Sequence, residues 1–528
     1  METTGLSLID GAPSAEGTEA FRASDPARGV AVDPEFFTAS ADEVDRAAKL
    51  ADEAFRTYGR TTAAERALFL RTLAEEIEMV RPDLMERGPI ETGLPAGRIE
   101  AETGRTVAQL RLFADLVEEG SWVDARIDHA DPSRTPVPKP DVRSMYRPLG
   151  PVAIFCASNF PVAFSVAGGD TASALAAGNP VVVVAHHAHP GTAEIVGWAV
   201  IRALRACRLP LGTFALLQGR GEDVGVPLVK HPAIRAVGFT GSRGGGLALA
   251  RVAAGREVPI PVFAEMSSVN PVFVLPDALA TRGESIAAGL HASVTLGVGQ
   301  FCTNPGFVHL PAGAAADAFA DRLAALARAT TSAPMLTEAI RKNYRAGTQR
   351  WDSCATKVTS TDDPDGPGGQ GAGVAVFRVR GADLLAGRVP NGEVFGPCTV
   401  LVEYDSRDEL LALAESWEGQ LTATIHGRDD EVAAHADLVQ ALERCAGRVL
   451  FGGFPTGVEV CHAMVHGGPF PSTSDGRSTS VGTRAILRFV RPVCWQNAPT
   501  ELLPAELQEA NPLGIRRLVD GVEIGRTS

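Results

Sequence analysis

The sequence predicts an α/β protein whose parallel sheets are covered by helices on both faces. Short apolar runs of the buried-strand kind, such as PVAIFCA at 151–157, alternate with helical segments through the first half of the chain. The same alternation resumes from about residue 271. With 528 residues, of which 45% are hydrophobic and 21% charged, the chain is long and apolar enough to bury more than one core.

The first 130 residues predict an irregular start followed by helices. Residues 1–39 are rich in Gly, Pro and Ser, and we expect them to form an arm over the surface. Two Ser/Thr-x-x-Glu patterns, at 40–43 and 62–65, have the spacing of a capping box, which predicts a helix beginning at each. A further helix is expected over 98–118.

The middle of the chain predicts an extended excursion and then repeated strand and helix units. Four prolines within 131–140 exclude a helix there. In the units that follow, apolar strands alternate with helices, which implies parallel pairing. The expected strands are 151–157, 180–185, 213–217 and 236–239, and the expected helices are 163–177, 195–206 and 224–230.

The second half predicts one long exposed loop among further strands and helices. The segment DDPDGPGGQGAG at 362–373 has the composition of a solvent-exposed loop. Amphipathic helices are expected over 408–417 and 431–443, and a strand is expected over 448–451. Another strand is expected within RAILRFVRPVCWQN at 484–497.

Charge and cysteine usage exclude several classes of partner. The formal net charge of −14 argues against nucleic acid and anionic membrane surfaces. We see no secretory signal, and the most apolar stretch, 151–184, is too interrupted by polar residues and glycines for a membrane helix. The eight cysteines contain no CxxC pair and no cluster suited to zinc or a disulfide framework. We therefore expect a cytoplasmic protein with no metal site.

One cysteine, Cys302, is set apart by its surroundings, GVGQFCTNP at 297–305. The common alternative for any cysteine is a small buried apolar side chain. A second segment, FAEMSSVNP at 263–271, places the carboxylate of Glu265 in an apolar setting, where an ionised group is costly unless it has a partner or a function. Two further segments accompany these, ASNFP at 157–161 and GEVFGP at 392–397.

These four segments, in the order in which they follow one another along the chain, resemble the aldehyde dehydrogenase superfamily. The resemblance covers about residues 20–505. Within it, AGGDTASALAAGNP and TGVEVCHAMVHGGPFPSTSDGRSTSVGT are most similar to the 2-oxoglutarate semialdehyde (2,5-dioxopentanoate) dehydrogenases, with the NADP-preferring bacterial fatty aldehyde dehydrogenase as a sister. The resemblance implies a homodimer with a Rossmann-like cofactor domain, an α/β catalytic domain and a small β oligomerisation element. The corresponding ranges are 1–130 with 151–262, then 263–475, then 131–150 with 481–500.

The resemblance assigns catalysis to Cys302, Glu265 and Asn159. A thiol with a pKa of about 8.5 is a weak nucleophile at neutral pH, so Cys302 requires a base or an electropositive site. We expect its attack on an aldehyde to give a thiohemiacetal whose oxyanion binds the Asn159 amide and the Cys302 backbone N–H. Hydride transfer to nicotinamide then gives a thioester, and Glu265 activates the water that hydrolyses it. We expect desolvation to raise the pKa of Glu265 toward the working range.

A glycine-rich turn, FTGSRGGG at 239–246, follows a predicted strand and begins a predicted helix. Glycines let the backbone approach a phosphate, and a helix N-terminus offers free amide donors to it. The resemblance gives each remaining cofactor contact a place. It assigns Gly241 and Ser242 to the pyrophosphate, Glu393 to the nicotinamide ribose, Phe395 to the aromatic position beside it, and Phe155 and Ser158 to the cofactor path.

One departure from the family pattern concerns the adenosine end of the cofactor. The family lysine that holds the adenosine ribose is replaced here by Val184, which offers no donor. His187 and Arg220 could instead meet a 2′-phosphate, which favours NADP slightly over NAD. The alternative is that the histidines of 186–189 are simply polar loop residues.

Several functions remain open from the sequence alone. The leading one is NAD(P)-dependent oxidation of 2-oxoglutarate semialdehyde, and its alternatives are oxidation of a long-chain fatty aldehyde and a cofactor-impaired binding protein. A cysteine hydrolase that pairs Cys302 with His291 is a further class, although neither the QACxG nor the CGSC signature occurs. His462 and His466 are expected near the mouth of the site, and Arg477 is a candidate partner for a substrate carboxylate.

Overall fold

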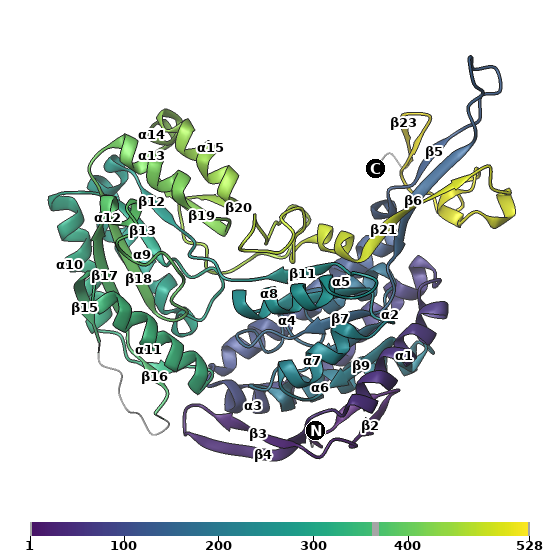
Figure 1. Cartoon of the computed structure of the whole chain (residues 1–528), viewed down its shortest axis with the longest axis horizontal. Helices are drawn as coiled ribbons and strands as arrows, with labels where there is room; N and C mark the ends of the chain where they lie inside the picture. Colours follow the sequence, from purple (N-terminus) through teal and green to yellow (C-terminus); the bar gives the residue numbers. More distant parts are fainter. Residues whose placement is uncertain (1–2, 362–368, 526–528) are drawn as a thin grey trace.

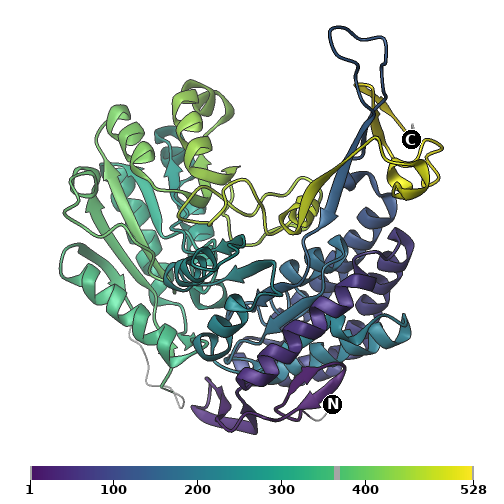
Figure 2. The same cartoon turned by 45° about the vertical axis from the view of Figure 1, so that its right-hand side comes forward.

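The computed structural model describes residues 3–361 and 369–525, which form two bodies and a projecting arm (Figure 1). Each body is built on a seven-stranded sheet. The predicted α/β class is confirmed. In the turned view the two bodies still lie side by side, with the C-terminal part of the chain, coloured yellow, running between them (Figure 2). None of the described helices is long and apolar enough to cross a membrane.

The first sheet contains the predicted strand and helix units. Five adjacent strands, from one edge of the sheet inward, are parallel, and an antiparallel hairpin from the N-terminus extends the sheet beyond them. The strand order is β11 (Val262–Glu265), β10 (Ala236–Thr240), β7 (Val152–Phe155), β8 (Val181–Val184), β9 (Phe214–Leu217), β1 (Ser7–Ile9) and β2 (Ala12–Ser14).

Alternation along these strands divides the apolar side chains between two cores. Val181 and Val183 point into one core, and Val182 and Val184 point into the other, as a period of two residues requires. Five helices cover the first face: α2 (Ala63–Met79), α3 (Arg81–Thr92), α4 (Ala96–Glu119), α5 (Gly169–Ala177) and α6 (Pro190–Ala206). Three cover the second face: α1 (Ala41–Tyr58), α7 (Gly221–Lys230) and α8 (Arg243–Ala254).

The second sheet is parallel except at one edge, where its first two strands pair antiparallel. Its order is β15 (Thr356–Ser360), β17 (Ala375–Arg380), β18 (Cys398–Tyr404), β13 (Phe307–Pro311), β12 (Val272–Val274), β19 (Gln420–His426) and β20 (Ala446–Phe451). Helices α9 (Pro276–Thr295) and α10 (Ala314–Arg328) pack on one face. The other face carries α11 (Glu338–Asp352), α12 (Gly381–Leu385), α13 (Arg407–Ser416), α14 (Asp429–Ala434) and α15 (Ala436–Cys445).

The arm is a five-stranded sheet that projects from the first body (Figure 1). Its order is β21 (Val490–Gln496), β6 (Val142–Pro148), β5 (Arg126–Asp128), β22 (Arg517–Val519) and β23 (Val522–Ile524). The proline-rich excursion forms its exposed end, closed by a bridge between Asp131 and Lys139. The sheet therefore also includes β5, which precedes the expected range 131–150, and β22 and β23, which follow the expected range 481–500.

Some local predictions are confirmed and others are wrong. Both capping boxes are present, at Ser40 and Thr62. The first 39 residues, expected to form an arm over the surface, contain paired strands: β1 joins the first sheet beside β9, and β3 (Ala20–Asp25) pairs with β4 (Val30–Phe37). Two helices differ: the one expected at 163–177 begins at Gly169, and the one expected at 431–443 is divided at His435.

Two other expected segments need comment. Of the loop expected over 362–373, residues 362–368 lie outside the described residues, and Gly371–Ala372 forms β16, which pairs with β14 (Ala333–Pro334). The strand expected in 484–497 is half correct, because the 3-10 helix η4 (Thr483–Phe489) precedes β21.

Candidate active site

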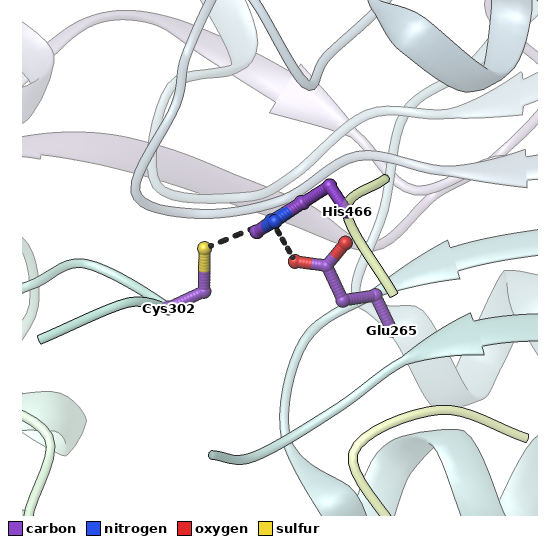
Figure 3. Close-up of side chains that lie close together, drawn as sticks. All are labelled: Glu265, Cys302 and His466. Carbon is purple, nitrogen blue, oxygen red and sulfur yellow. Dashed lines mark hydrogen bonds and ion pairs between the residues drawn. The ribbon is translucent and has the colours of Figure 1, made fainter. Parts of the chain in front are cut away.

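Three side chains converge at one point, and His466 lies between the other two (Figure 3). The Sγ atom of Cys302 is 3.4 Å from Nε2 of His466, and the same nitrogen is 2.9 Å from Oε1 of Glu265. His466 is fully buried and Glu265 nearly so. Among the described residues this is the one group of three or more His, Cys, Asp or Glu side chains that could hold a metal ion. Their ligand atoms all lie within 4.8 Å of one another. The absence of a metal site stays a prediction.

The three residues come from three separate parts of the chain. Glu265 is the last residue of β11 in the first sheet. Cys302 lies between the short helix η3 (Leu296–Gly299) and β13 of the second sheet. His466 belongs to the segment that runs from β20 back toward η4. The group therefore exists only where both bodies and this returning segment meet.

The returning segment is fixed to β11 by backbone hydrogen bonds. The amide of Met266 donates to the carbonyl of Ser472 (2.7 Å), and the amide of Ser474 donates to the carbonyl of Ala264 (2.9 Å). Farther along, the hydroxyl of Ser480 donates to Oε2 of Glu265 over 2.6 Å. One segment thus supplies partners to both oxygens of the Glu265 carboxylate, which fixes its orientation.

The turn that carries Cys302 is strained. Gly297, Val298 and Gly299 have φ of 56°, 59° and 64°, and for a β-branched residue such as Val298 this left-handed conformation costs about 1–2 kcal/mol. A Cβ at Gly299 would lie 2.3 Å from the carbonyl of Gly396, so only glycine fits. Buried Asn270 donates from Nδ2 to the Cys302 carbonyl over 2.9 Å. Such strain persists because the surroundings fix the turn.

The electrostatics of the group correct one expectation. Burial alone would raise the pKa of Glu265, but the charge of His466 and the hydrogen bonds from His466 and Ser480 outweigh it, so the pKa lies below its ordinary value. The predicted rise is wrong because these partners stabilise the ionised carboxylate. Burial, followed by the negative charge of Glu265, holds the pKa of the Cys302 thiol well above its usual range. The thiol therefore rests protonated beside an ionised base.

Asn159 lies beside the thiol and is held from both sides. Its Nδ2 donates to the carbonyl of Gln300 over 3.0 Å, which leaves one amide hydrogen free. The guanidinium of Arg98 donates to the carbonyl of Asn159 over 3.3 Å, and it lies between the rings of Phe160 and Phe301. Helix α4 thus holds the Asn159 backbone through Arg98, and the turn before Cys302 holds its side-chain amide through Gln300.

A cavity of about 190 Å³ opens beside these groups. It brings together eight of the eleven predicted site residues: Cys302, Glu265, Asn159, Ser158, Gly241, Ser242, Glu393 and Phe395. Thr240, Met266, Ser267, Ile340 and Asn343 complete its lining. The sequence places acids, amides and an aromatic ring together in one cleft.

The residues of this cavity fit a dinucleotide. Ser242 caps α8 and accepts from the amide of Gly245, so the free N–H groups of the helix begin at the cavity wall. A Cβ at Gly246 would lie 2.8 Å from the Met266 side chain, so the glycine lets α8 approach β11 closely. At the other side, burial raises the pKa of Glu393 to about 7, although the Ser267 hydroxyl and the Ser268 amide donate to its carboxylate.

Three predicted cofactor residues do not line this cavity. Phe155 is buried at the end of β7, and its ring packs 6.2 Å from that of Phe239. His187 is exposed, and its ring stacks on His186 at 4.5 Å. Arg220 is exposed at the start of α7. Their contact with a cofactor stays a prediction.

The other candidate side chains lie elsewhere. His291 is not in the group at Cys302, and its Nε2 bonds the hydroxyl of Thr330, which follows α10. Arg477 is 91% exposed and pairs with Asp475, its neighbour in the same turn. His462 is exposed. The histidine beside the thiol is therefore His466, one of the two expected near the mouth of the site, and not the His291 that a cysteine hydrolase was expected to use.

Sequence reasoning missed three residues that shape the site: Ser480, Asn270 and Arg98. Asn270 stood inside the FAEMSSVNP segment, so its presence near the thiol was within reach. Ser480 and Arg98 carry no local signal, because each acts across a long sequence separation.

Comparison with known proteins agrees with this geometry. The aldehyde dehydrogenase family matches residues 14–468. The chain is 49% identical to alpha-ketoglutaric semialdehyde dehydrogenase 2 of Azospirillum brasilense over 99% of each chain. It is 47% identical to an alpha-ketoglutaric semialdehyde dehydrogenase of Acinetobacter baylyi over 92% of each.

Among solved structures, gamma-glutamyl-gamma-aminobutyraldehyde dehydrogenase of Burkholderia cenocepacia has a TM-score of 0.81 at 22% identity, covering 94% of this chain and 97% of that one. This likeness confirms the predicted fold. The family match covers most of the chain, and the two relatives are nearly half identical over almost their whole length, which together establish the family. The chain belongs to the aldehyde dehydrogenase family, and it is an NAD(P)-dependent aldehyde dehydrogenase.

Proposed function

We propose that this enzyme oxidises 2-oxoglutarate semialdehyde (2,5-dioxopentanoate) to 2-oxoglutarate. The observation that carries the chemistry is the contact of Cys302, His466 and Glu265 beside a cavity that fits a dinucleotide. The substrate rests on the names of the two relatives that share nearly half of their residues with this chain.

The first step is attack by Cys302. Because its thiol pKa is raised, the proton must leave as the aldehyde arrives, and the His466–Glu265 pair lies within reach to accept it. A bond then forms between Sγ and the carbonyl carbon, and the carbonyl oxygen becomes an oxyanion. The free amide hydrogen of Asn159 is placed to bind that oxygen, and loss of such a donor costs about 10²–10³ in rate.

When bound, the nicotinamide cofactor supplies the hydride acceptor that converts the thiohemiacetal to a thioester. Ser242 and the N-terminus of α8 would hold its pyrophosphate, and Glu393 would accept hydrogen bonds from its ribose. Phe395 and Ser158 line the cavity beside these groups.

The last step is hydrolysis by a water molecule that Glu265 activates. With its pKa lowered, Glu265 is ionised at neutral pH and acts as a base rather than as a resting acid. The proton that the pair accepted in the first step must have passed to solvent by then, so that Glu265 is ionised again. Glu265 takes a proton from water, the water oxygen bonds to the acyl carbon, and the carbon–sulfur bond breaks. The acid is released, and the Cys302 thiolate takes up the proton that Glu265 holds. Ser480 keeps the carboxylate oriented during this step.

At the adenosine end, the proposal is a modest preference for NADP over NAD. It rests on His187 and Arg220, which stand exposed after β8 and at the start of α7. A guanidinium suits a phosphate because it donates two parallel hydrogen bonds. Val184 in place of a lysine leaves the ribose without one donor.

We also propose that the arm sheet is the oligomerisation element and that the enzyme is a homodimer. The arm projects away from the first body, and alternate residues of its edge strand β21 are exposed (Figure 1). A solution mass measurement tests this, and a monomer of 55.3 kDa would contradict it.

The function is tested by following reduced nicotinamide absorbance with NAD and NADP against a panel of aldehydes. We expect the highest kcat/KM with 2,5-dioxopentanoate. A higher value with a long-chain aldehyde would favour fatty aldehyde oxidation instead. Calorimetric titration with both cofactors accompanies it, because the absence of heat at millimolar cofactor would indicate the cofactor-impaired alternative.

A further inference from the structure

A second polar group lies on α4 near the active site, behind the ring of Phe164 and outside the lining of the cavity. It lies at a small apolar cluster around Phe164, which includes the partly buried Val458 and Met464. The Phe164 ring is 6.3 Å from that of His466, so the cluster adjoins the catalytic group directly.

Arg105 stands over this cluster with unused hydrogen-bond donors. Its guanidinium carbon is 5.2 Å from the centre of the Phe164 ring. Its Nη1 donates to the carbonyl of Val458 over 2.7 Å. Its Nε and Nη2 are buried, and neither donates to any residue within 3–361 or 369–525. Buried donors of a charged group are costly to leave unpaired, so each such case calls for an explanation.

The nearby carboxylates are already committed to other partners. Glu102 pairs with Arg98 and accepts from the amides of Val162 and Ala163. Glu265 binds His466 and Ser480, as described above. Neither is available to Arg105.

The third carboxylate that influences Arg105, Glu459, is exposed and accepts from the neighbouring amide of Val460. Burial lowers the pKa of Arg105, and the charges of Glu102, Cys302, Glu459 and Glu265 oppose that effect. The arginine therefore lies close to the catalytic group, yet its Nε and Nη2 have no partner among the described residues.

We infer that Arg105 forms a carboxylate subsite that binds the acid end of a short oxo-acid semialdehyde while its aldehyde end meets Cys302. The inference rests on the proposed function and deepens it. A guanidinium edge with two free N–H donors matches the two oxygens of a carboxylate. One aromatic ring separates the arginine from the catalytic histidine, so a substrate whose carboxylate lies a few carbons from the carbonyl reaches both.

Arg448 offers a matched control. It also lies near the sulfur, since the Cys302 charge acts on it. In contrast to Arg105, both of its terminal nitrogens are used, Nη1 by the carbonyl of Gly457 over 3.2 Å and Nη2 by that of Pro455 over 2.6 Å. Arg448 therefore holds the 455–457 loop, and among the described residues only its Nε lacks a partner, whereas Arg105 has both Nε and Nη2 unpaired.

The experiment compares two aldehydes of equal chain length, 2,5-dioxopentanoate and pentanal, at saturating cofactor. For Arg105→Met we expect the ratio of kcat/KM for dioxopentanoate over pentanal to fall about 10- to 100-fold, mainly through KM of the charged substrate. Arg105→Lys keeps the charge without the fork and should lie between the two. Arg448→Met should lower both rates together and leave the ratio unchanged.

A binding measurement keeps the inference independent of turnover. Glutarate should compete with dioxopentanoate in the wild type, and its inhibition constant should rise about 10-fold or more in Arg105→Met. An unchanged ratio with unchanged glutarate inhibition would overturn the subsite, and so would an equal loss on both aldehydes in every Arg105 variant. If the wild type itself shows no preference for dioxopentanoate, the proposed function fails, whatever the variants do.

Discussion

The two ends of the cofactor cleft differ in how firmly the chain specifies them. At the catalytic end, Cys302, His466 and Glu265 are held by contacts from three segments, and Asn270 and Ser480 fix their backbone and orientation. At the adenosine end, the position of the family lysine is taken by a buried valine, and the candidate basic side chains are exposed. The catalytic group is thus held by several contacts, whereas the proposed adenosine end offers few side chains that could hold the cofactor.

The strongest test of this contrast removes the nucleophile. We expect Cys302→Ala to lower turnover by at least about 10³-fold, because no other described thiol lies beside His466 and Glu265. Cofactor affinity, measured by calorimetry, should stay within about twofold, since Ser242 and Glu393 are untouched. Cys354→Ala, at an exposed cysteine, is the matched control and should keep wild-type turnover. Comparable turnover in Cys302→Ala would remove the mechanism.

The adenosine end is tested by two substitutions that remove its basic groups. Arg220→Ala and His187→Ala should each raise KM for NADP, the arginine variant by about 10-fold, while KM for NAD changes little. Only NADP carries the 2′-phosphate that these side chains would meet. Steady-state kinetics with both cofactors measures the difference. Equal effects on the two cofactors would mean that neither side chain reads the phosphate.

At the catalytic end, Ser480→Ala isolates the orientation of Glu265. The hydroxyl stabilises the ionised carboxylate, so its loss should raise the pKa of Glu265 and move the acid limb of the kcat profile to higher pH by about one pH unit. Turnover then falls more at low pH than at high pH. Ser478→Ala, two residues away, serves as the control. A uniform fall at every pH would indicate a packing defect instead.

The smallest effect is expected from the acid between the two ends. Because burial raises the pKa of Glu393 to about 7, this side chain loses its charge as the pH falls through neutrality. The ionised form is the better acceptor for ribose hydroxyls, so KM for the cofactor should rise by a few-fold between about pH 8 and about pH 6. Glu393→Gln should abolish this dependence. A pH-independent KM in the wild type would exclude the contact.

Local sequence patterns predicted those elements whose stabilising contacts lie within a few residues of one another. Capping boxes at Ser40 and Thr62 involve partners three residues apart, so one sequence suffices to find them. The helix expected from residue 163 begins only at Gly169, because residues 161–168 form turns, in which the amides of Val162 and Ala163 donate to the distant Glu102. A contact across such a separation cannot be seen in a window of a few residues.

The site followed the same rule. Cys302, Glu265 and Asn159 came from motifs, and the structure brings them to one cavity. The choice of histidine and the direction of the Glu265 pKa shift depended on the segment that returns to β11, which no spacing rule could place. A carboxylate in an apolar run looks desolvated until its partners are known.

Because the returning segment around His466 and Ser480 contacts both bodies, catalytic activity depends on how the two bodies are packed against each other. Its hydrogen bonds to β11 join a residue of one sheet to a thiol carried by the other. Heating that breaks these hydrogen bonds would abolish activity while most helices stay folded. Heat inactivation should therefore occur at a lower temperature than the loss of the far-ultraviolet circular dichroism signal. The difference between the two midpoint temperatures would report the strength of the contact between the two bodies.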